Sequence, residues 1–91
     1  MNEYLPELFQ RMLDEMRTNK PPYKSLEALK SRAADKFLNS PDSLKLSERD
    51  LRIYANILDM ADHFLHEPKS RDKIAKKAED QTKEIFQKPK D

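Results

Sequence analysis

Residues 5–16 read LPELFQRMLDEM, and the spacing of the apolar residues in this stretch decides the fold. An α-helix turns by about 100° per residue, so side chains three or four positions apart lie on one face. The apolar side chains keep that spacing throughout: Leu5, Leu8, Phe9, Met12, Leu13 and Met16. Three later stretches carry a similar stripe, and the 91-residue chain contains no glycine. The sequence therefore predicts an all-α fold, a small antiparallel four-helix bundle.

Prolines separate these stretches and set the expected helix bounds. Pro6 is expected in the first turn of the first helix, where a missing N–H removes no helical hydrogen bond. The remaining prolines end helices, because the residue before a proline is disfavoured in the α region. The expected helices cover about residues 4–18, 26–39, 47–66 and 70–87. They form a single helical-bundle domain over residues 1–88, followed by a short polar tail over residues 89–91.

The third stretch has the best-marked start and the widest apolar arc. Ser47 and Asp50 have the spacing of a capping box, and Leu46 and Leu51 are placed to contact each other across it. The arc is wider than one neighbouring helix can cover, which predicts that this helix is central. It consists of Tyr54, Leu58, Ala61 and Leu65, extended by Ile53, Ile57, Met60 and Phe64.

The fourth stretch is expected to pack most weakly. Its stripe is thin and contains a threonine: Ile74, Ala78, Thr82 and Ile85, flanked by Ala75 and Phe86. Opposite charges one turn apart are expected to pair, as Asp72 with Lys76, Glu79 with Lys83 and Glu84 with Lys88. Such pairs add only about 0.2–0.5 kcal/mol each, so this helix depends on a small apolar contact.

One edge of the third helix is a candidate partner seam. Ile53, Met60 and Phe64 form this edge. If only two helices cover the third, the edge stays exposed and offers a surface to a partner protein or to a second copy of the chain. In the alternative interpretation another helix of the bundle covers it, which is the more common arrangement in monomers.

A basic run at the start of the fourth helix is the second candidate surface. Lys69, Arg71, Lys73, Lys76 and Lys77 are candidate phosphate contacts. Arg49 and Arg52 offer a further basic pair at the start of the third helix. The alternative is an ordinary solvated helix face, because acidic residues alternate with these lysines and no aromatic residue lies among them.

One cluster of side chains could bind a metal or act in acid–base catalysis. It consists of Asp59, Asp62, His63, His66 and Glu67. The helical wheel places both histidines away from the apolar arc, in water, where a catalytic site would lack shelter. The absence of glycine excludes phosphate-binding loops and nucleophile elbows, and there is no cysteine for a thiolate or a disulfide. We therefore expect no enzyme, no cofactor and no metal site.

Composition indicates a cytoplasmic protein. Hydrophobic residues make up 36% of the chain and charged residues 38%, and the formal net charge is only +1. No signal peptide is visible at Met1 and no apolar stretch is long enough to span a bilayer. The near-neutral charge argues against a general electrostatic partner such as nucleic acid or anionic lipid.

These patterns predict a non-enzymatic binding protein. We expect an inhibitor, immunity, adaptor or regulatory protein that acts on another protein, with a homodimer as one form of that association. The alternative is a small nucleic-acid-associated regulator that uses the basic run over residues 69–77. The helix order, from Leu8-Phe9 through Tyr54-Ala55 to Ile85-Phe86, resembles the layout of the small cytosolic immunity proteins against pediocin-like bacteriocins. This resemblance is one of layout and implies no functional residue.

Overall fold

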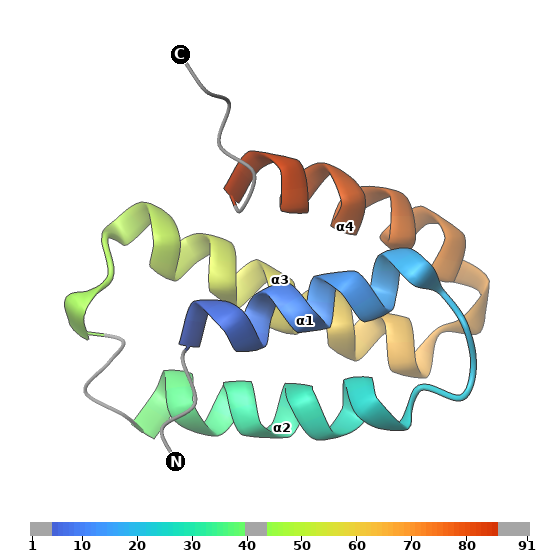
Figure 1. Cartoon of the computed structure of the whole chain (residues 1–91), viewed down its shortest axis with the longest axis horizontal. Helices are drawn as coiled ribbons and strands as arrows, with labels where there is room; N and C mark the ends of the chain where they lie inside the picture. Colours follow the sequence, from blue (N-terminus) through green and yellow to red (C-terminus); the bar gives the residue numbers. More distant parts are fainter. Residues whose placement is uncertain (1–4, 40–43, 86–91) are drawn as a thin grey trace.

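The chain folds into helices throughout the described part. A computed structural model describes residues 5–39 and 44–85 (Figure 1). It contains four α-helices and one short 3-10 helix: α1 Leu5–Thr18, α2 Lys24–Asn39, α3 Glu48–His66, η2 Pro68–Ser70 and α4 Arg71–Ile85. These residues form no β-strand, which confirms the all-α prediction. None of the described helices is long and apolar enough to cross a membrane.

The end of α1 is set by Asn19, whose backbone has a φ of 52°. Asparagine tolerates this left-handed conformation better than most residues, and it commonly stops a helix in this way. The Asn19 N–H donates to the Glu15 carbonyl at 3.1 Å, which satisfies one of the last carbonyls of α1. The helix bounds therefore follow the prediction closely at this end.

The starts of α2 and α3 differ in how well the sequence predicted them. Ser47 caps α3 as expected, its hydroxyl accepting from the Asp50 N–H at 3.1 Å. Helix α2, in contrast, begins two residues earlier than predicted, because the Glu27 N–H already donates to the carbonyl of Tyr23. The C-terminal end of the predicted domain and the predicted tail lie outside the described residues.

The core is built around α1. All six apolar residues of its stripe are buried, and α1 contacts each of the other three α-helices. Figure 1 shows it between α2 and α4, with α3 behind it. The prediction that the third helix is central is therefore not confirmed. An aromatic cluster joins the first three helices: Phe9 stacks on Tyr54 with ring centroids 4.3 Å apart, and Phe37 meets both rings edge-on.

Helix α3 is rotated relative to the predicted wheel. Its buried residues are Tyr54, Ile57, Ala61 and Phe64. Two predicted stripe residues, Leu58 and Leu65, are only partly buried and border one side of this stripe. The wide apolar arc thus has a buried middle and two half-exposed edges, which is what a helix with neighbours on part of its surface requires.

Helix α4 packs against α1 through small side chains. Ile74, Ala78 and Thr82 are buried, and the Thr82 hydroxyl donates to the Ala78 carbonyl at 2.8 Å. The small Ala78 side chain and the internally bonded Thr82 let the two helix backbones approach closely. The described residues show neither the Asp72–Lys76 nor the Glu79–Lys83 ion pair that the sequence predicted, and the third predicted pair lies outside them.

Candidate partner-binding surfaces

The predicted seam is only partly present on the surface. Ile53 and Met60 are half-buried and pack against the core. Phe64 is fully buried, so its side chain is not available to a partner, and this part of the prediction is corrected. Its ring lies edge-on to Tyr23, with centroids 4.9 Å apart, and under the Arg71 guanidinium. The α1–α2 connection therefore covers the residue that the helical wheel placed at an edge.

Arg71, the one arginine of the basic run, is engaged in contacts within the fold. Arg71 donates to the Phe64 carbonyl at 2.7 Å and to the Leu65 carbonyl at 3.3 Å, and its guanidinium lies 4.5 Å from the centre of the Tyr23 ring. These contacts satisfy carbonyls at the end of α3 and add a cation–π contact. Arg71 therefore has a structural role, and its contact with phosphate stays a prediction. The other members remain exposed: Lys69, Lys73, Lys76 and Lys77.

Asn19 and Asp72 add further contacts next to Arg71, between the end of α1 and the start of α4. The Asn19 amide donates to the Asp72 carboxylate at 3.1 Å, and the Tyr23 hydroxyl donates to the Asn19 side-chain oxygen at 2.7 Å. Asp72 thus pairs with a residue 53 positions away and not with Lys76 one turn along its own helix. We call Asn19, Tyr23, Phe64, Arg71 and Asp72 the corner cluster. It joins the end of α1 to the start of α4.

The histidine and carboxylate cluster lies on the exposed outer face of α3, as predicted. His63 stands between two carboxylates, with Glu67 at 2.5 Å and Asp59 at 3.6 Å. The hydrogen bond and charge of Glu67, together with the charge of Asp59, raise the pKa of His63 above its ordinary value of 6.5. Among the described residues, no three His, Cys, Asp or Glu side chains are grouped so that they could hold a metal ion.

Asp62 links this face of α3 to α2. Its carboxylate accepts from the Lys30 ammonium at 2.9 Å and lies 3.3 Å from His66. The hydrogen bond and charge of Lys30 lower the pKa of Asp62 below its ordinary value of 3.8. The ion pair is partly exposed, so it adds little to stability.

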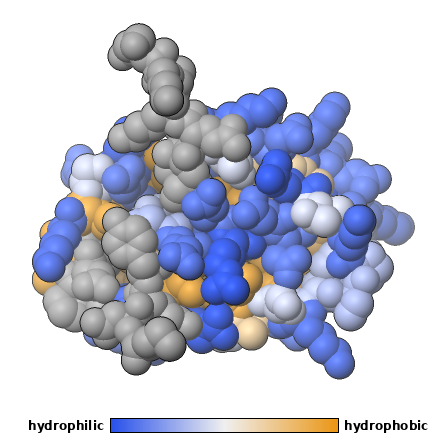
Figure 2. Space-filling view, viewed as in Figure 1, coloured by the Kyte–Doolittle hydropathy of each residue, from blue (hydrophilic) through white to orange (hydrophobic). Residues whose placement is uncertain are grey.

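The exposed apolar end of the molecule was not predicted. Leu38 near the end of α2 is 73% exposed, and Leu44 before α3 is 85% exposed. They are the two exposed large hydrophobic residues among those described. We call them the apolar end. Figure 2 shows hydrophobic colour at the end of the molecule where α3 begins. Leu38 lies within the apolar pattern of α2, and that pattern alone does not reveal that no other helix covers it.

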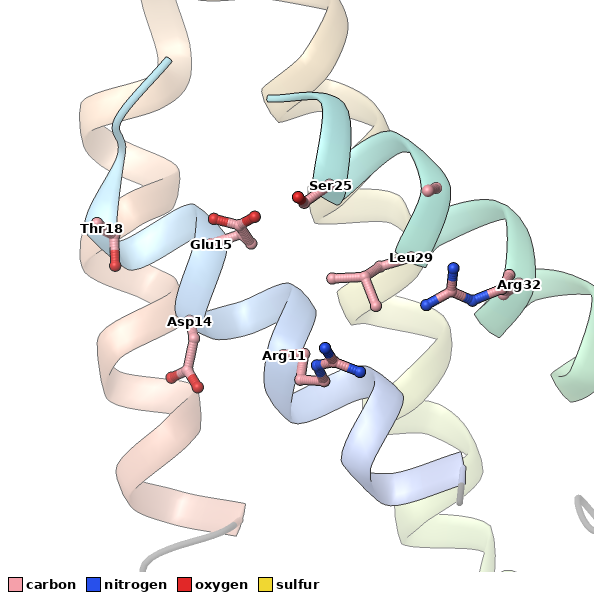
Figure 3. A pocket seen from close by; sticks show the side chains of 8 residues that line it. Arg11, Asp14, Glu15, Thr18, Ser25, Leu29 and Arg32 are labelled. Atoms are coloured by element: carbon pink, nitrogen blue, oxygen red, sulfur yellow. The ribbon is translucent and has the colours of Figure 1, made fainter. Parts of the chain in front are cut away.

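A groove of about 410 Å³ runs between α1 and α2. Its floor contains Leu29, and hydrophobic colour shows through between the two helices in Figure 2. Figure 3 shows the guanidiniums of Arg11 and Arg32 directed toward each other on either side of Leu29. At the other end of the groove, the Glu15 carboxylate and the Ser25 hydroxyl face each other. The groove therefore has a basic end, an apolar middle and an acidic end.

Comparison with known proteins adds no assignment to these surfaces. No family model, no curated protein and no solved structure matches the chain. The resemblance to the bacteriocin immunity proteins thus remains one of helix layout.

Proposed function

We propose that this chain is a non-enzymatic cytoplasmic protein that acts by binding another protein through its apolar end. The observation that carries the proposal is the pair Leu38 and Leu44, 73% and 85% exposed in a chain whose other large apolar side chains, where described, are at least partly buried. Exposing two leucines near each other in the sequence has an unfavourable hydration free energy, which a bound partner would remove. Leucine side chains at a helix end are suited to fill an apolar pocket on a partner surface.

The scaffold supports such a role. In this proposal it is an antiparallel four-helix bundle whose fourth helix is held least firmly. The three aromatic residues that join α1, α2 and α3 hold the end of α2 in place, because Phe37 precedes Leu38 directly. A fixed anchor loses less conformational entropy on binding than a flexible one. The half-buried Ile53 and Met60 form a second, weaker apolar surface on α3.

Site-specific photo-crosslinking tests the proposal. A photoreactive phenylalanine analogue is placed at position 38 or 44 in the cells that produce the protein, and at the exposed position of Glu79 as the control. We expect both apolar-end positions to yield an adduct with the same protein and the control to yield none. An adduct at twice the mass of the chain identifies a second copy as the partner. Equal labelling from all three positions, or no protein adduct, contradicts the proposal.

A second candidate function is nucleic-acid binding by α4. The observation that favours it is that Lys73 is exposed on this helix about one turn before the exposed pair Lys76 and Lys77. Affinity for random duplex DNA would then fall with salt, with a log–log slope of about −0.9 for each phosphate contacted. The variant Lys76→Gln should make that slope less steep by about one unit. A chain with no measurable affinity at low salt rules this candidate out.

A further inference from the structure

The α1–α2 groove separates charges that could have neutralised each other. Arg11 and Glu15 are one helical turn apart on α1, the usual spacing for an ion pair. The described residues nevertheless show no ion pair between them, and Figure 3 shows the two side chains directed to opposite ends of the groove. Asp14, the other nearby carboxylate, pairs with Arg17 at 3.0 Å. Arg11 and Glu15 can therefore contact an incoming ligand.

In the groove on the other side of α2, the charged side chains already contact each other. It has a volume of about 460 Å³ and lies between α2 and α3. Its charges are already engaged, since Lys30 donates to Asp62 at 2.9 Å and His66 lies 3.3 Å from the same carboxylate. A ligand there would have to break an existing contact between two helices. The α1–α2 groove is the better candidate site.

The chemistry of the groove defines its ligand. Guanidinium groups bind carboxylates in a planar, two-point geometry, so the basic end selects an acidic side chain. Ala28, which is exposed, and Leu29, which is 5% exposed, line the middle of the groove, and Glu15 attracts a lysine or an arginine at the acidic end. A volume of about 410 Å³ falls in the range of known ligand pockets and suits a few side chains.

We infer that the α1–α2 groove binds a helical segment of the partner protein that presents an acidic, an apolar and a basic side chain in that order. The inference rests on the proposed function, because it names the partner surface that a protein-binding chain would recognise. Arg11 and Glu15 are four positions apart on α1, which corresponds to about 6 Å along the helix. A partner helix matches this separation with Glu at position i, Leu at i+3 and Lys at i+4.

Two synthetic peptides test this inference with the full chain. Each is alanine-based, about sixteen residues long so that it is partly helical, and blocked at both ends. One carries Glu, Leu and Lys at positions i, i+3 and i+4, and in the other Glu and Lys are exchanged. Binding is followed by the amide chemical shifts of the isotope-labelled chain. We expect the first peptide to shift residues of α1 and α2 along the groove and to bind about fivefold more tightly than the second.

Charge reversal in the protein sharpens the test. Arg11 is exposed, so Arg11→Glu should retain the fold, which circular dichroism checks. It should abolish the preference between the two peptides, because each peptide then has one matched and one mismatched charge. Arg11→Gln should reduce the preference without abolishing it. Lys77→Glu on α4 makes the same change in net charge at a distant exposed position, and it should leave the preference unchanged.

Three outcomes overturn the inference: equal affinity for the two peptides, shifts that lie outside the groove, or no binding at millimolar peptide. These results are separable from the test of the proposed function. If crosslinking at the apolar end captures a protein while the peptides show no preference, the groove inference fails and the function stands. If the peptides show the expected preference while crosslinking fails, the groove inference holds and the proposal that the apolar end binds the partner is wrong.

Discussion

Helices α1 and α4 pack against each other, yet they contribute to the core in different ways. Helix α1 buries six large apolar side chains and contacts every other α-helix. The buried residues described on α4 are Ile74, Ala78 and Thr82. The first helix is held by the area it removes from water, and the last by close approach of small side chains. A long contact between two helices is therefore not necessarily a strongly stabilising one.

The largest expected effect is on α1. Phe9 is fully buried between the Tyr54 and Phe37 rings, so Phe9→Ala should lower the free energy of unfolding by about 3–5 kcal/mol. Denaturant unfolding measures this loss, which is a large share of the stability of a small domain. Glu7→Ala on the exposed face of α1 is the control and should change stability by less than about 0.5 kcal/mol. A small loss for Phe9→Ala would mean that α1 is not the centre of the core.

A smaller effect is expected on α4, where the substitution enlarges a buried side chain instead of removing one. Ala78 is fully buried against its neighbours, so Ala78→Leu should overpack the contact and cost about 1–3 kcal/mol. Amide hydrogen exchange should show α4 opening before α1 in the unmodified chain and still earlier in the variant. Glu79→Leu, an equally large side chain at the next, exposed position, should leave α4 protected. Exchange that is equally slow in α1 and α4 would contradict a weak fourth helix.

The corner cluster that joins these two helices comes next. Asn19→Ala removes two side-chain hydrogen bonds and places an alanine in the left-handed region, which together should cost about 1–2 kcal/mol. Asn19→Gly loses the same hydrogen bonds without the backbone strain, so thermal unfolding should give it a smaller loss. If both variants are equally stable, the backbone conformation of Asn19 has no energetic role.

The smallest expected effect lies outside both helices, at His63. Its pKa is raised in the folded chain, so protonation favours folding. The stabilisation should be fully present below pH 6.5, the ordinary pKa of histidine, and should be lost as the pH rises through the folded-state pKa. The difference in unfolding free energy between the unmodified chain and His63→Gln, measured across this range, should therefore shrink as the pH rises. A difference that stays constant or grows would contradict the ion pairs with Asp59 and Glu67.

Local patterns predicted those parts of the structure that neighbouring residues determine. The spacing in residues 5–16 identified all six buried residues of α1, and the Ser47 cap depends on atoms three residues apart. Helix α3 was recognised, but its rotation was not, because Phe64 is covered by Tyr23 and Arg71 from other segments. A helical wheel describes which residues share a face and cannot tell which neighbour lies opposite.

The candidate surfaces were harder to predict for the same reason. Arg71 resembles its neighbouring lysines in the sequence, and only the folded corner shows that its guanidinium contacts Phe64 and Leu65 carbonyls. Leu38 has the spacing of a core residue, yet it is 73% exposed, whereas the adjacent Phe37 contacts α1 and α3. The α1–α2 groove depends on how two helices lie against each other, which no single stretch of sequence encodes.

The Asn19–Asp72 hydrogen bond spans 53 residues and has a consequence for how the chain is made. When α1 first emerges from the ribosome, it has no α4 to pack against and no Asp72 or Arg71 to hold the turn that follows it. Its apolar side chains can pack against α2 and α3 once these are made, but their contact with α4 has to form after residue 85 has been synthesised. Nascent chains that stop short of residue 71 should therefore remain open to chaperones and proteases, and protection should appear only once α4 is complete.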